Sequence, residues 1–294
     1  MIYILGGTGQ LGSAITQEAA TRGFRVERAG RAVCDVREPI LIANFLREAT
    51  DDDTIINCVG GLWADDAESQ PEKAMELYCH THETIAREAA HHYARIAYVS
   101  SDFVFDGNRQ HPYNESDEPH PLNWYGFAKA AGEWVTRRSG ARWHIYRTSS
   151  LFGEYAGSRL NFVDRVAMAV REGEQFNAVA DITMTPTYAG DAAQAIISLV
   201  ERDADCGIYH IANRGSVTWF DLASEVENKM TEDGLIWPVA STGMDHKAER
   251  PRQSALVSAR LHQYNLHLRP WQEALATYMD IKRYTKPEYE AMVK

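Results

Sequence analysis

The chain has 294 residues, of which 45% are hydrophobic and 24% charged, and its formal net charge is −11 at pH 7. This length suits one or two globular domains with a large core, and the acidic balance argues against a nucleic-acid or membrane-surface partner. No apolar run approaches the ~20 residues that a membrane span needs.

The first predicted element is a strand over Ile2–Leu5, and a loop with the spacing Gly-x-x-Gly-x-x-Gly follows it directly. In such a loop the first glycine permits a tight turn, the second lets a pyrophosphate approach the backbone, and the third lets the next helix pack on the strand. That helix runs to about Arg22 and would point its N-terminus at the phosphates. The loop therefore predicts dinucleotide binding by Gly6, Thr8, Gly9, Gln10, Leu11 and Gly12.

The second predicted strand, Arg25–Arg28, ends where a dinucleotide fold reads the adenosine ribose of the cofactor. An acidic residue there would bind the 2′-hydroxyl and repel a 2′-phosphate, but the stretch from Arg28 to Arg31 has two arginines and no carboxylate. Arg31 therefore favours NADP(H), with NAD(H) still allowed. Asp35 and Val36 come next and are candidates for contact with the adenine edge.

Strands and helices alternate through the first half of the chain. We expect a helix over Pro39–Ala49, a strand over Thr54–Cys58, a long helix over Pro71–Tyr93, and strands over Ile96–Val99 and Trp143–Arg147. This alternation is typical of an α/β fold with a doubly wound parallel sheet of Rossmann type, in which ligands sit at the carboxyl ends of the strands. Val59 and Gly60 follow one strand end and leave room for a cofactor, and Thr148 follows another.

Histidines and cysteines predict neither a metal site nor a disulfide. The long predicted helix carries His80, His82, His91 and His92, but no third ligand stands at a convincing spacing, so we expect surface histidines and no metal. The four cysteines form no Cys-x-x-Cys pair, and the N-terminus has no basic leader. These features predict a cytoplasmic chain with reduced thiols.

The stretch from Val99 to Lys129 carries the candidate chemistry. Tyr125 and Lys129 stand four apart at the start of a predicted helix, so both side chains lie on one face. An ammonium close to a phenol favours the phenolate, so Lys129 is expected to lower the tyrosine pKa from its usual ~10. Tyr125 is then a candidate proton donor or acceptor for a carbonyl group, and Ser100 and Ser101 can place a hydroxyl beside the same oxygen.

The second half of the chain is less regular. We expect helices over Leu160–Arg171, Ala189–Glu201, Trp219–Met230 and Trp271–Arg283, a strand over Cys206–Ala212, and Thr218 as an N-cap. Residues 1–150, with about 185–212, would form the NAD(P)-binding domain, and residues 151–184 and 213–294 a smaller mixed α/β lobe that binds the substrate. Three arginines of this lobe could hold a diphosphate: Arg159, Arg250 and Arg252.

Together these motifs resemble the dTDP-4-dehydrorhamnose reductase family, a branch of the extended short-chain dehydrogenase/reductases. The match covers nearly the whole chain and rests on GGTGQLG at 6–12, SSDFVFDG at 100–107 and YGFAK at 125–129, with Gly132-Glu133, Pro186-Thr187 and Arg250-Pro251. The resemblance implies NAD(P)H-dependent reduction of the 4-keto group of a nucleotide-linked 6-deoxyhexose, in deoxysugar and polysaccharide biosynthesis. It also implies that Ser101 is the catalytic hydroxyl, Tyr125 the general acid, and Lys129 the residue that orients the cofactor ribose.

The chain departs from the family pattern where the sugar would pack. Ser150 stands in place of a tryptophan, Gly61 and Leu62 replace a tyrosine and a threonine, and Trp63 is the candidate replacement for the lost aromatic wall. The identity of the sugar and of the nucleotide therefore stays open. The expected substrate contacts are Trp63, Ser101, Phe103, Tyr125, Ser150, Asn161 and Arg250, and Ser100 joins the expected cofactor contacts.

Two further departures lie outside the sugar wall. Tyr78 stands where an asparagine is common in the family. Ala14 stands where some members carry a glutamate that binds magnesium at a dimer contact, which again predicts no metal. A homodimer is compatible with the resemblance, and the oligomeric state stays open.

Two alternatives to a reductase remain. The first is a nucleotide-sugar epimerase or dehydratase, which uses the same triad. A dehydratase is expected to carry a pair of acidic residues after the active-site serine, but only Asp102 stands between Ser101 and Phe103. A non-catalytic NADP-binding regulatory subunit would be indicated by the loss of Tyr125 or Lys129, and both are present.

Overall fold

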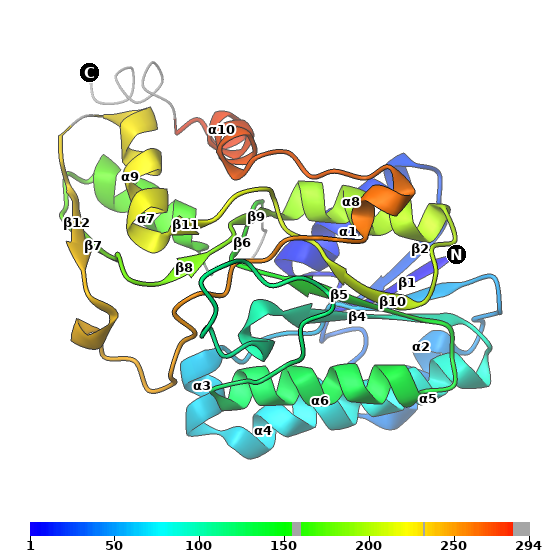
Figure 1. Cartoon of the computed structure of the whole chain (residues 1–294). Helices are drawn as coiled ribbons and strands as arrows, with labels where there is room; N and C mark the ends of the chain where they lie inside the picture. The colour runs from blue at the N-terminus through cyan, green and yellow to red at the C-terminus, as the bar shows by residue number, and fades with distance from the viewer. Residues whose placement is uncertain (155–159, 232, 285–294) are drawn as a thin grey trace.

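The computed structural model describes residues 1–154, 160–231 and 233–284 (Figure 1). Its main sheet has six parallel strands in the order β10-β5-β4-β3-β1-β2. These are β1 (Ile2–Leu5), β2 (Val26–Ala29), β3 (Thr54–Asn57), β4 (Arg95–Ser101), β5 (Trp143–Thr148) and β10 (Gly207–His210). The chain leaves β1 toward one edge and returns to its other side at β3, so the topological switch point lies between β1 and β3. The predicted doubly wound α/β fold is confirmed.

Helices cover both faces of this sheet (Figure 1). On one face lie α1 (Gln10–Thr21) and α8 (Ala189–Glu201), and on the other α2 (Pro39–Leu46), α5 (Thr81–His91) and α6 (Trp124–Arg138). A parallel sheet covered on both faces requires strands that are apolar on both faces, which explains the near-continuous apolar runs of the sequence.

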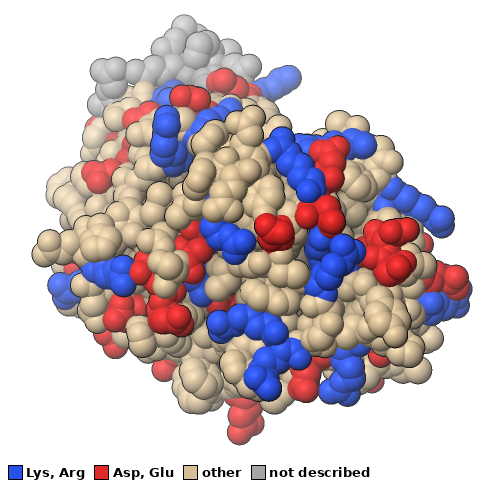
Figure 2. All heavy atoms as spheres, turned by 45° about the vertical axis from the view of Figure 1, so that its right-hand side comes forward, with Lys and Arg blue, Asp and Glu red and all other residues tan. Residues whose placement is uncertain are grey.

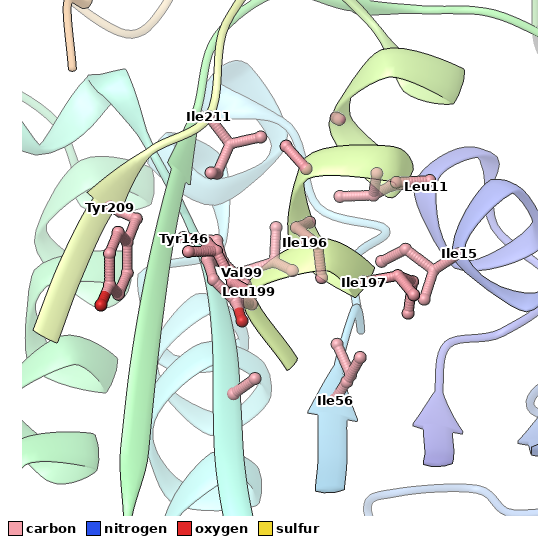
Figure 3. Packing of buried hydrophobic residues seen from close by; sticks show 14 of the residues in the cluster. Leu11, Ile15, Ile56, Val99, Tyr146, Ile196, Ile197, Leu199, Tyr209 and Ile211 are labelled. Atoms are coloured by element: carbon pink, nitrogen blue, oxygen red, sulfur yellow. The ribbon is translucent and has the colours of Figure 1, made fainter. Parts of the chain in front are cut away.

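The side chains of β1 show how the two layers divide. Ile2 and Ile4 join the apolar cluster between the sheet and α1 and α8, whose packing around Ile15 is drawn in Figure 3. Tyr3 and Leu5 join the cluster on the opposite face, beneath α2 and α5. Successive residues of a strand point to opposite faces, so each strand contributes to both layers.

The predicted helix over Pro71–Tyr93 is interrupted. It consists of α4 (Pro71–Met75), a π-helical turn η1 (Glu76–His80) and α5, and it is preceded by the short helix α3 (Ala64–Ser69). Within the π-helical turn the carbonyl of Tyr78 accepts a hydrogen bond from the Tyr98 hydroxyl at 3.0 Å. Such turns are found frequently at functional sites.

His82 corrects the expectation that the histidines of this segment lie at the surface. His80 and His91 are exposed, but His82 is fully buried. Its ring accepts a hydrogen bond from Asn57 Nδ2 at 3.0 Å and donates one to Thr136 Oγ1 at 2.7 Å, and burial lowers its pKa to about 3. The ring is therefore neutral and ties β3 to α6. Among the described residues, no group of three or more His, Cys, Asp or Glu could hold a metal ion.

A second apolar core lies beside the sheet, at the upper left of Figure 1. It is built from α7 (Phe162–Arg171), α9 (Trp219–Met230), α10 (Trp271–Lys282) and the parallel pair β7 (Phe176–Val179) and β12 (Ile236–Val239). Two short pairs adjoin it: β6 (Leu151–Phe152) with β9 (Thr187–Tyr188), and β8 (Thr183–Met184) with β11 (Val217–Thr218). Thr218 caps α9 as predicted, because its hydroxyl accepts from Asp221 N at 3.0 Å.

The remaining regular segments are short 3-10 turns: η2 (Asp102–Val104), η3 (Ser241–Gly243) and η4 (Leu261–Tyr264). On the face drawn in Figure 2, positive and negative side chains are interspersed rather than gathered in one basic patch. Within the described residues, every helix is too short or too polar to cross a membrane.

Candidate active site

The carboxyl end of β4 presents two serines with different surroundings. Ser100 Oγ donates to Glu133 Oε1 at 2.6 Å, in a fully buried cluster in which Glu133 also pairs with Arg147 at 2.7 Å. Ser101 Oγ instead lies 2.9 Å from Asp102 Oδ1 and accepts a hydrogen bond from Phe103 N at 3.2 Å. Because the side chains of a strand alternate, Ser101 is the residue whose hydroxyl can face a ligand at this strand end, and the Ser100 hydroxyl is engaged beneath it.

The N-terminus of α6 is pressed against the turn that follows Ser101. Asn123 caps the helix, its side chain accepting from Gly126 N at 2.9 Å. A Cβ added at Gly126 would come within 2.0 Å of the Phe103 carbonyl oxygen, so only glycine permits this approach. The approach places Tyr125 beside Ser101, and the Phe103 ring contacts the Tyr125 ring edge-on at 5.6 Å between centroids.

Lys129 lies one helical turn further along α6 and is buried. Its Nζ donates to the Val99 carbonyl at 2.9 Å and lies 4.3 Å from the ring centroid of Tyr78, 5.1 Å from that of Tyr98 and 6.0 Å from that of Tyr125. These rings attract the ammonium, but burial dominates and lowers the lysine pKa to about 7.

The pKa of Tyr125 corrects one expectation. Burial raises it to about 12, hydrogen bonding with the Ser101 hydroxyl lowers it, and the nearby Asp102 raises it again. Lys129 was expected to lower the pKa of Tyr125, but burial has the larger effect. The Lys129 ammonium is directed at the Val99 carbonyl, and burial makes the charged form of the lysine itself costly. A phenol with this pKa is protonated at neutral pH, which suits a proton donor.

The glycine loop forms a cradle at the switch point of the sheet. Gly6 has a φ of +74°, and a Cβ added at Gly12 would come within 2.4 Å of the Gly6 carbonyl oxygen. Gly9 is the N-cap of α1, which has no side-chain cap and no acidic residue in its first turn. The free N–H groups of this helix end fit the phosphates of a dinucleotide.

Three side chains of the loop lie in different places. Thr8 is exposed and Gln10 Nε2 donates to the Gly153 carbonyl at 2.9 Å, which ties the loop to the end of β6. Leu11 is buried in the core against the sheet, so it can offer a ligand only its backbone.

The other expected cofactor contacts line the same edge of the sheet. Gly60 is exposed, and a Cβ added there would meet no atom of the described residues within 4 Å. Val59 N donates to Asn57 Oδ1 at 2.9 Å, and Thr148 Oγ1 lies 3.5 Å from the Ser100 carbonyl oxygen.

The end of β2 carries a carboxylate held between two guanidinium groups. Arg31 Nε lies 3.3 Å from Asp35 Oδ2, and Arg37 donates to Oδ1 at 2.9 Å and to Oδ2 at 2.5 Å. Hydrogen bonds from Arg37 hold the pKa of Asp35 far below its usual range. Asp35 is thus occupied by arginines, Val36 is buried, and Arg37 is a cation that the sequence analysis did not single out.

The expected substrate contacts are only partly brought together. Phe103 lies against Tyr125, and Ser150 follows β5 in a left-handed conformation with φ +44°. Asn161 is the N-cap of α7, and its Nδ2 donates to the Gly153 carbonyl, the Asp164 carboxylate and the Tyr278 hydroxyl. Its amide is therefore already engaged. Arg159 lies outside the described residues.

Arg250 is engaged by a carboxylate of α3. Its Nη1 lies 2.8 Å from Asp65 Oδ1 and its Nη2 2.6 Å from Asp65 Oδ2, and Asp65 Oδ1 also accepts from the backbone of Lys247 and Ala248. Trp63, the N-cap of α3, is 55% exposed two residues before Asp65. This contact joins α3, beside the expected sugar wall, to the segment between η3 and η4 (residues 244–260), which we call the C-terminal segment.

Two residues of the site were not proposed from the sequence. Asp102 lies beneath Ser101, and Tyr78 lies beneath Tyr125 and Lys129. The Tyr78 hydroxyl donates to the Leu62 carbonyl at 2.5 Å and accepts from Leu62 N at 3.1 Å. The sequence offered a signal for each residue: Asp102 directly follows the candidate Ser101, and Tyr78 departs from the residue that is common in the family.

A doubly wound parallel sheet with a serine, tyrosine and lysine at the end of its central strands defines a Rossmann-type short-chain dehydrogenase/reductase. A family model described as the RmlD substrate binding domain matches residues 1–284. The chain belongs to the dTDP-4-dehydrorhamnose reductase family, which confirms the prediction from its motifs.

The relatives and solved structures agree with this assignment. The dTDP-4-dehydrorhamnose reductase of Mycolicibacterium smegmatis is 30% identical over 277 residues, covering 93% of this chain and 83% of that protein. The reductase of Escherichia coli K12 is 30% identical over 285 residues, covering 92% and 94%. The crystal structure of the Bacillus anthracis reductase in complex with NADP superposes with a TM-score of 0.87 at 28% identity, covering 95% and 98%.

More distant structures share the fold alone. The UDP-glucose 4-epimerase of Thermus thermophilus, solved with NAD, superposes with a TM-score of 0.77 at 18% identity.

Proposed function

We propose that this chain is an NADPH-dependent reductase of the 4-keto group of a nucleotide-linked 6-deoxyhexose, as in dTDP-rhamnose biosynthesis. The observation that carries the proposal is the arrangement of Ser101, a protonated Tyr125 and Lys129 at one strand end. Family membership supports the substrate class. Because Gly61, Leu62 and Ser150 change the expected sugar wall, the identity of the sugar has to be determined by experiment.

The cradle of this chain suits a nicotinamide dinucleotide. The loop from Gly6 to Gly12 offers backbone N–H groups to the pyrophosphate, and Arg31 and Arg37 offer two guanidinium groups at the end of β2, where a 2′-phosphate would lie. The NADP complex of the B. anthracis relative supports this choice. When bound, the reduced nicotinamide would supply a hydride to the carbonyl carbon of the substrate.

The residues of the chain supply the rest of the reaction. Tyr125 donates its phenolic proton to the carbonyl oxygen as negative charge develops there, so one hydride and one proton convert the ketone to an alcohol. Ser101 holds the same oxygen, and its hydroxyl then stabilises the tyrosine phenolate until that regains a proton from solvent. Lys129 fixes the strand end through Val99 and can turn toward a ribose hydroxyl.

We assign substrate binding to residues 151–184 and 213–294, and the NAD(P)-binding domain to residues 1–150 with about 185–212. The second apolar core supports this division, because most of its residues come from the proposed substrate-binding segments, although Tyr188 belongs to it and Leu261 packs with the cluster on the sheet. Arg250 of the substrate-binding part contacts Asp65 of the other part, and we assign Arg250 and Trp63 to the site for the nucleotide sugar.

The test is NADPH consumption with enzymatically prepared dTDP-4-keto-6-deoxy-L-mannose, with Tyr125→Phe beside the wild type. Turnover that disappears in the variant would support the reductase. Tight NADPH binding without turnover on a panel of keto-sugars would overturn it in favour of a regulatory subunit. Interconversion of sugars without net NADPH consumption would instead identify an epimerase.

A further inference from the structure

Asp102 is a buried carboxyl group surrounded by hydroxyls. Its Oδ1 lies 2.9 Å from Ser101 Oγ, and its Oδ2 accepts from Ser149 Oγ at 2.7 Å and from Ser254 Oγ at 2.6 Å. The three serines come from the end of β4, the turn after β5 and the C-terminal segment. Asp102 is 3% exposed, and no ion pair of the described residues includes it.

The proton of Ser101 cannot serve every partner at once. A serine hydroxyl has one proton to donate and two lone pairs that can accept, and one of these already accepts from Phe103 N. An anionic Asp102 would take the Ser101 proton and leave none for a substrate oxygen. A neutral Asp102 would itself donate from Oδ1 to Ser101 Oγ and free the serine proton. In both forms Oδ2 accepts from Ser149 and Ser254.

Two features favour the neutral form. Burial raises the pKa of Asp102, and the three hydroxyls that lower it are neutral dipoles rather than a counter-charge. A carboxylate beside the reacting oxygen would also oppose the negative charge that develops there, as it already opposes the ionisation of Tyr125.

We propose that Asp102 is a positioning residue that acts as a neutral carboxylic acid, donating a hydrogen bond to Ser101 so that the Ser101 proton points at the oxygen that Tyr125 protonates. This inference rests on the proposed reductase function. It gives a role to a buried carboxyl that contacts the Ser101 hydroxyl, and it makes the direction in which that hydroxyl donates depend on the protonation of Asp102.

The proposal fixes the direction of a pH effect. The groups that face Asp102 are Ser101 from β4, Tyr125 from α6, Ser149 from the turn after β5 and Ser254 from the C-terminal segment, and of these Tyr125 alone titrates. As the pH rises through the pKa of Asp102, the carboxylate forms and takes the Ser101 proton. The turnover number should therefore fall as the pH rises past the pKa of Asp102.

The first test compares Asp102→Asn with Asp102→Ala in the full-length chain, using NADPH and the keto-sugar. Asparagine can donate from Nδ2 to Ser101 while its Oδ1 accepts from Ser149 and Ser254, so it mimics the neutral acid. We expect kcat to fall less than about threefold in Asp102→Asn and about 100-fold in Asp102→Ala, as when one oxyanion donor is removed. The pH dependence of kcat that is due to Asp102 should also be absent from the asparagine variant.

Asp106→Asn is the matched control. It makes the same change in the same loop, at a carboxyl that accepts from the Tyr113 hydroxyl at 2.6 Å instead of contacting Ser101. We expect its kcat and pH profile to match the wild type. An Asp102→Asn variant that is folded by thermal unfolding but as inactive as Asp102→Ala would overturn the proposal.

A second measurement is independent of turnover. The infrared difference spectrum of wild type minus Asp102→Asn should contain the C=O stretch of a protonated carboxylic acid at neutral pH. A carboxylate band in its place would show that Asp102 is anionic and would overturn the proposal. If the wild type shows no turnover on any keto-sugar, the proposed function fails, while this spectrum still decides the state of Asp102.

Discussion

At the residue scale, Arg31 is the more exposed of the two arginines after β2 that favour NADPH. Arg31 is 76% exposed at its side chain and lies 3.3 Å from Asp35, whose carboxylate is held more closely by Arg37. An ion pair this exposed contributes little to stability, so the Arg31 guanidinium can turn toward a phosphate at low cost.

Arg31→Ala should raise the KM for NADPH by about tenfold or more and leave the KM for NADH nearly unchanged, because only NADPH carries the 2′-phosphate that a guanidinium would bind. Steady-state kinetics with both cofactors measures this. Arg47→Ala, which removes a similarly exposed arginine beyond α2, is the control. Equal effects of Arg31→Ala on the two cofactors would contradict the NADPH preference.

The lowered pKa of Lys129 predicts that the stability of the chain depends on pH. Burial lowers its pKa from 10.5 to about 7, so between these values the unfolded chain binds more protons than the folded chain. Stability then rises with pH through this window, by up to about 1.4 kcal/mol per pH unit, and the cost of burying the charge is fully present below pH 7.

Lys129→Met removes the titrating group and keeps the unbranched side chain. Relative to the wild type, the variant should be most stable at pH 7 and below, and this advantage should shrink by a few kcal/mol toward pH 10. Urea unfolding of both proteins at several pH values measures the difference. A difference that stays constant with pH would show that the lysine is not charged at a cost in the folded chain.

At the scale of elements, the π-helical turn η1 places Tyr78 where it connects two parts of the site. Its ring contacts Tyr125 edge-on at 5.5 Å and faces the Lys129 ammonium at 4.3 Å, while its hydroxyl bonds both backbone groups of Leu62. The turn thus links Tyr125 and Lys129 to the loop that carries Leu62.

Tyr78→Phe keeps the ring and removes the hydroxyl. We expect the KM for the nucleotide sugar to rise about fivefold to tenfold with a smaller change in kcat, and the free energy of unfolding to fall by about 1–2 kcal/mol, because the buried Leu62 groups lose their partner. Kinetics and urea unfolding measure these effects. Tyr93→Phe, at a tyrosine that is 79% exposed, is the control. If kcat falls while KM is unchanged, the loop tether is not the role of the hydroxyl.

The π-helical turn η1 is a feature that the sequence pattern did not predict. The order of strands and helices follows from apolar runs and glycines, which report local burial and backbone freedom. The residues from Pro71 to Tyr93 continue a helical pattern, and a π-helical turn inserts one residue without breaking it, so the interruption and the burial of His82 could not be read from spacing. Tertiary contacts with Asn57 and Thr136 hold His82 in the core.

At the scale of the whole molecule, the site depends on contacts between segments far apart in the chain. The spacing of Tyr125 and Lys129 is local and could be read from sequence, as could the glycine loop. The partners of Arg250 and Asp102 could not, since Asp65 and Ser254 lie 185 and 152 residues away from them. Arg250 was expected to contact the diphosphate because nothing local reveals that a carboxylate of α3 occupies it.

The Asp65–Arg250 pair makes the last prediction. Two parallel guanidinium–carboxylate bonds join α3 to the C-terminal segment, and they hold the pKa of Asp65 well below its usual range. If the pair acts by fastening these segments, Asp65→Ala and Arg250→Ala should each raise the KM for the nucleotide sugar by a similar factor, about tenfold. The double variant should then be no worse than either one, which corresponds to a coupling of about 1–2 kcal/mol. A larger effect of Arg250→Ala than of Asp65→Ala would show instead that the arginine leaves its partner to bind the diphosphate, because only the guanidinium can contact that group directly.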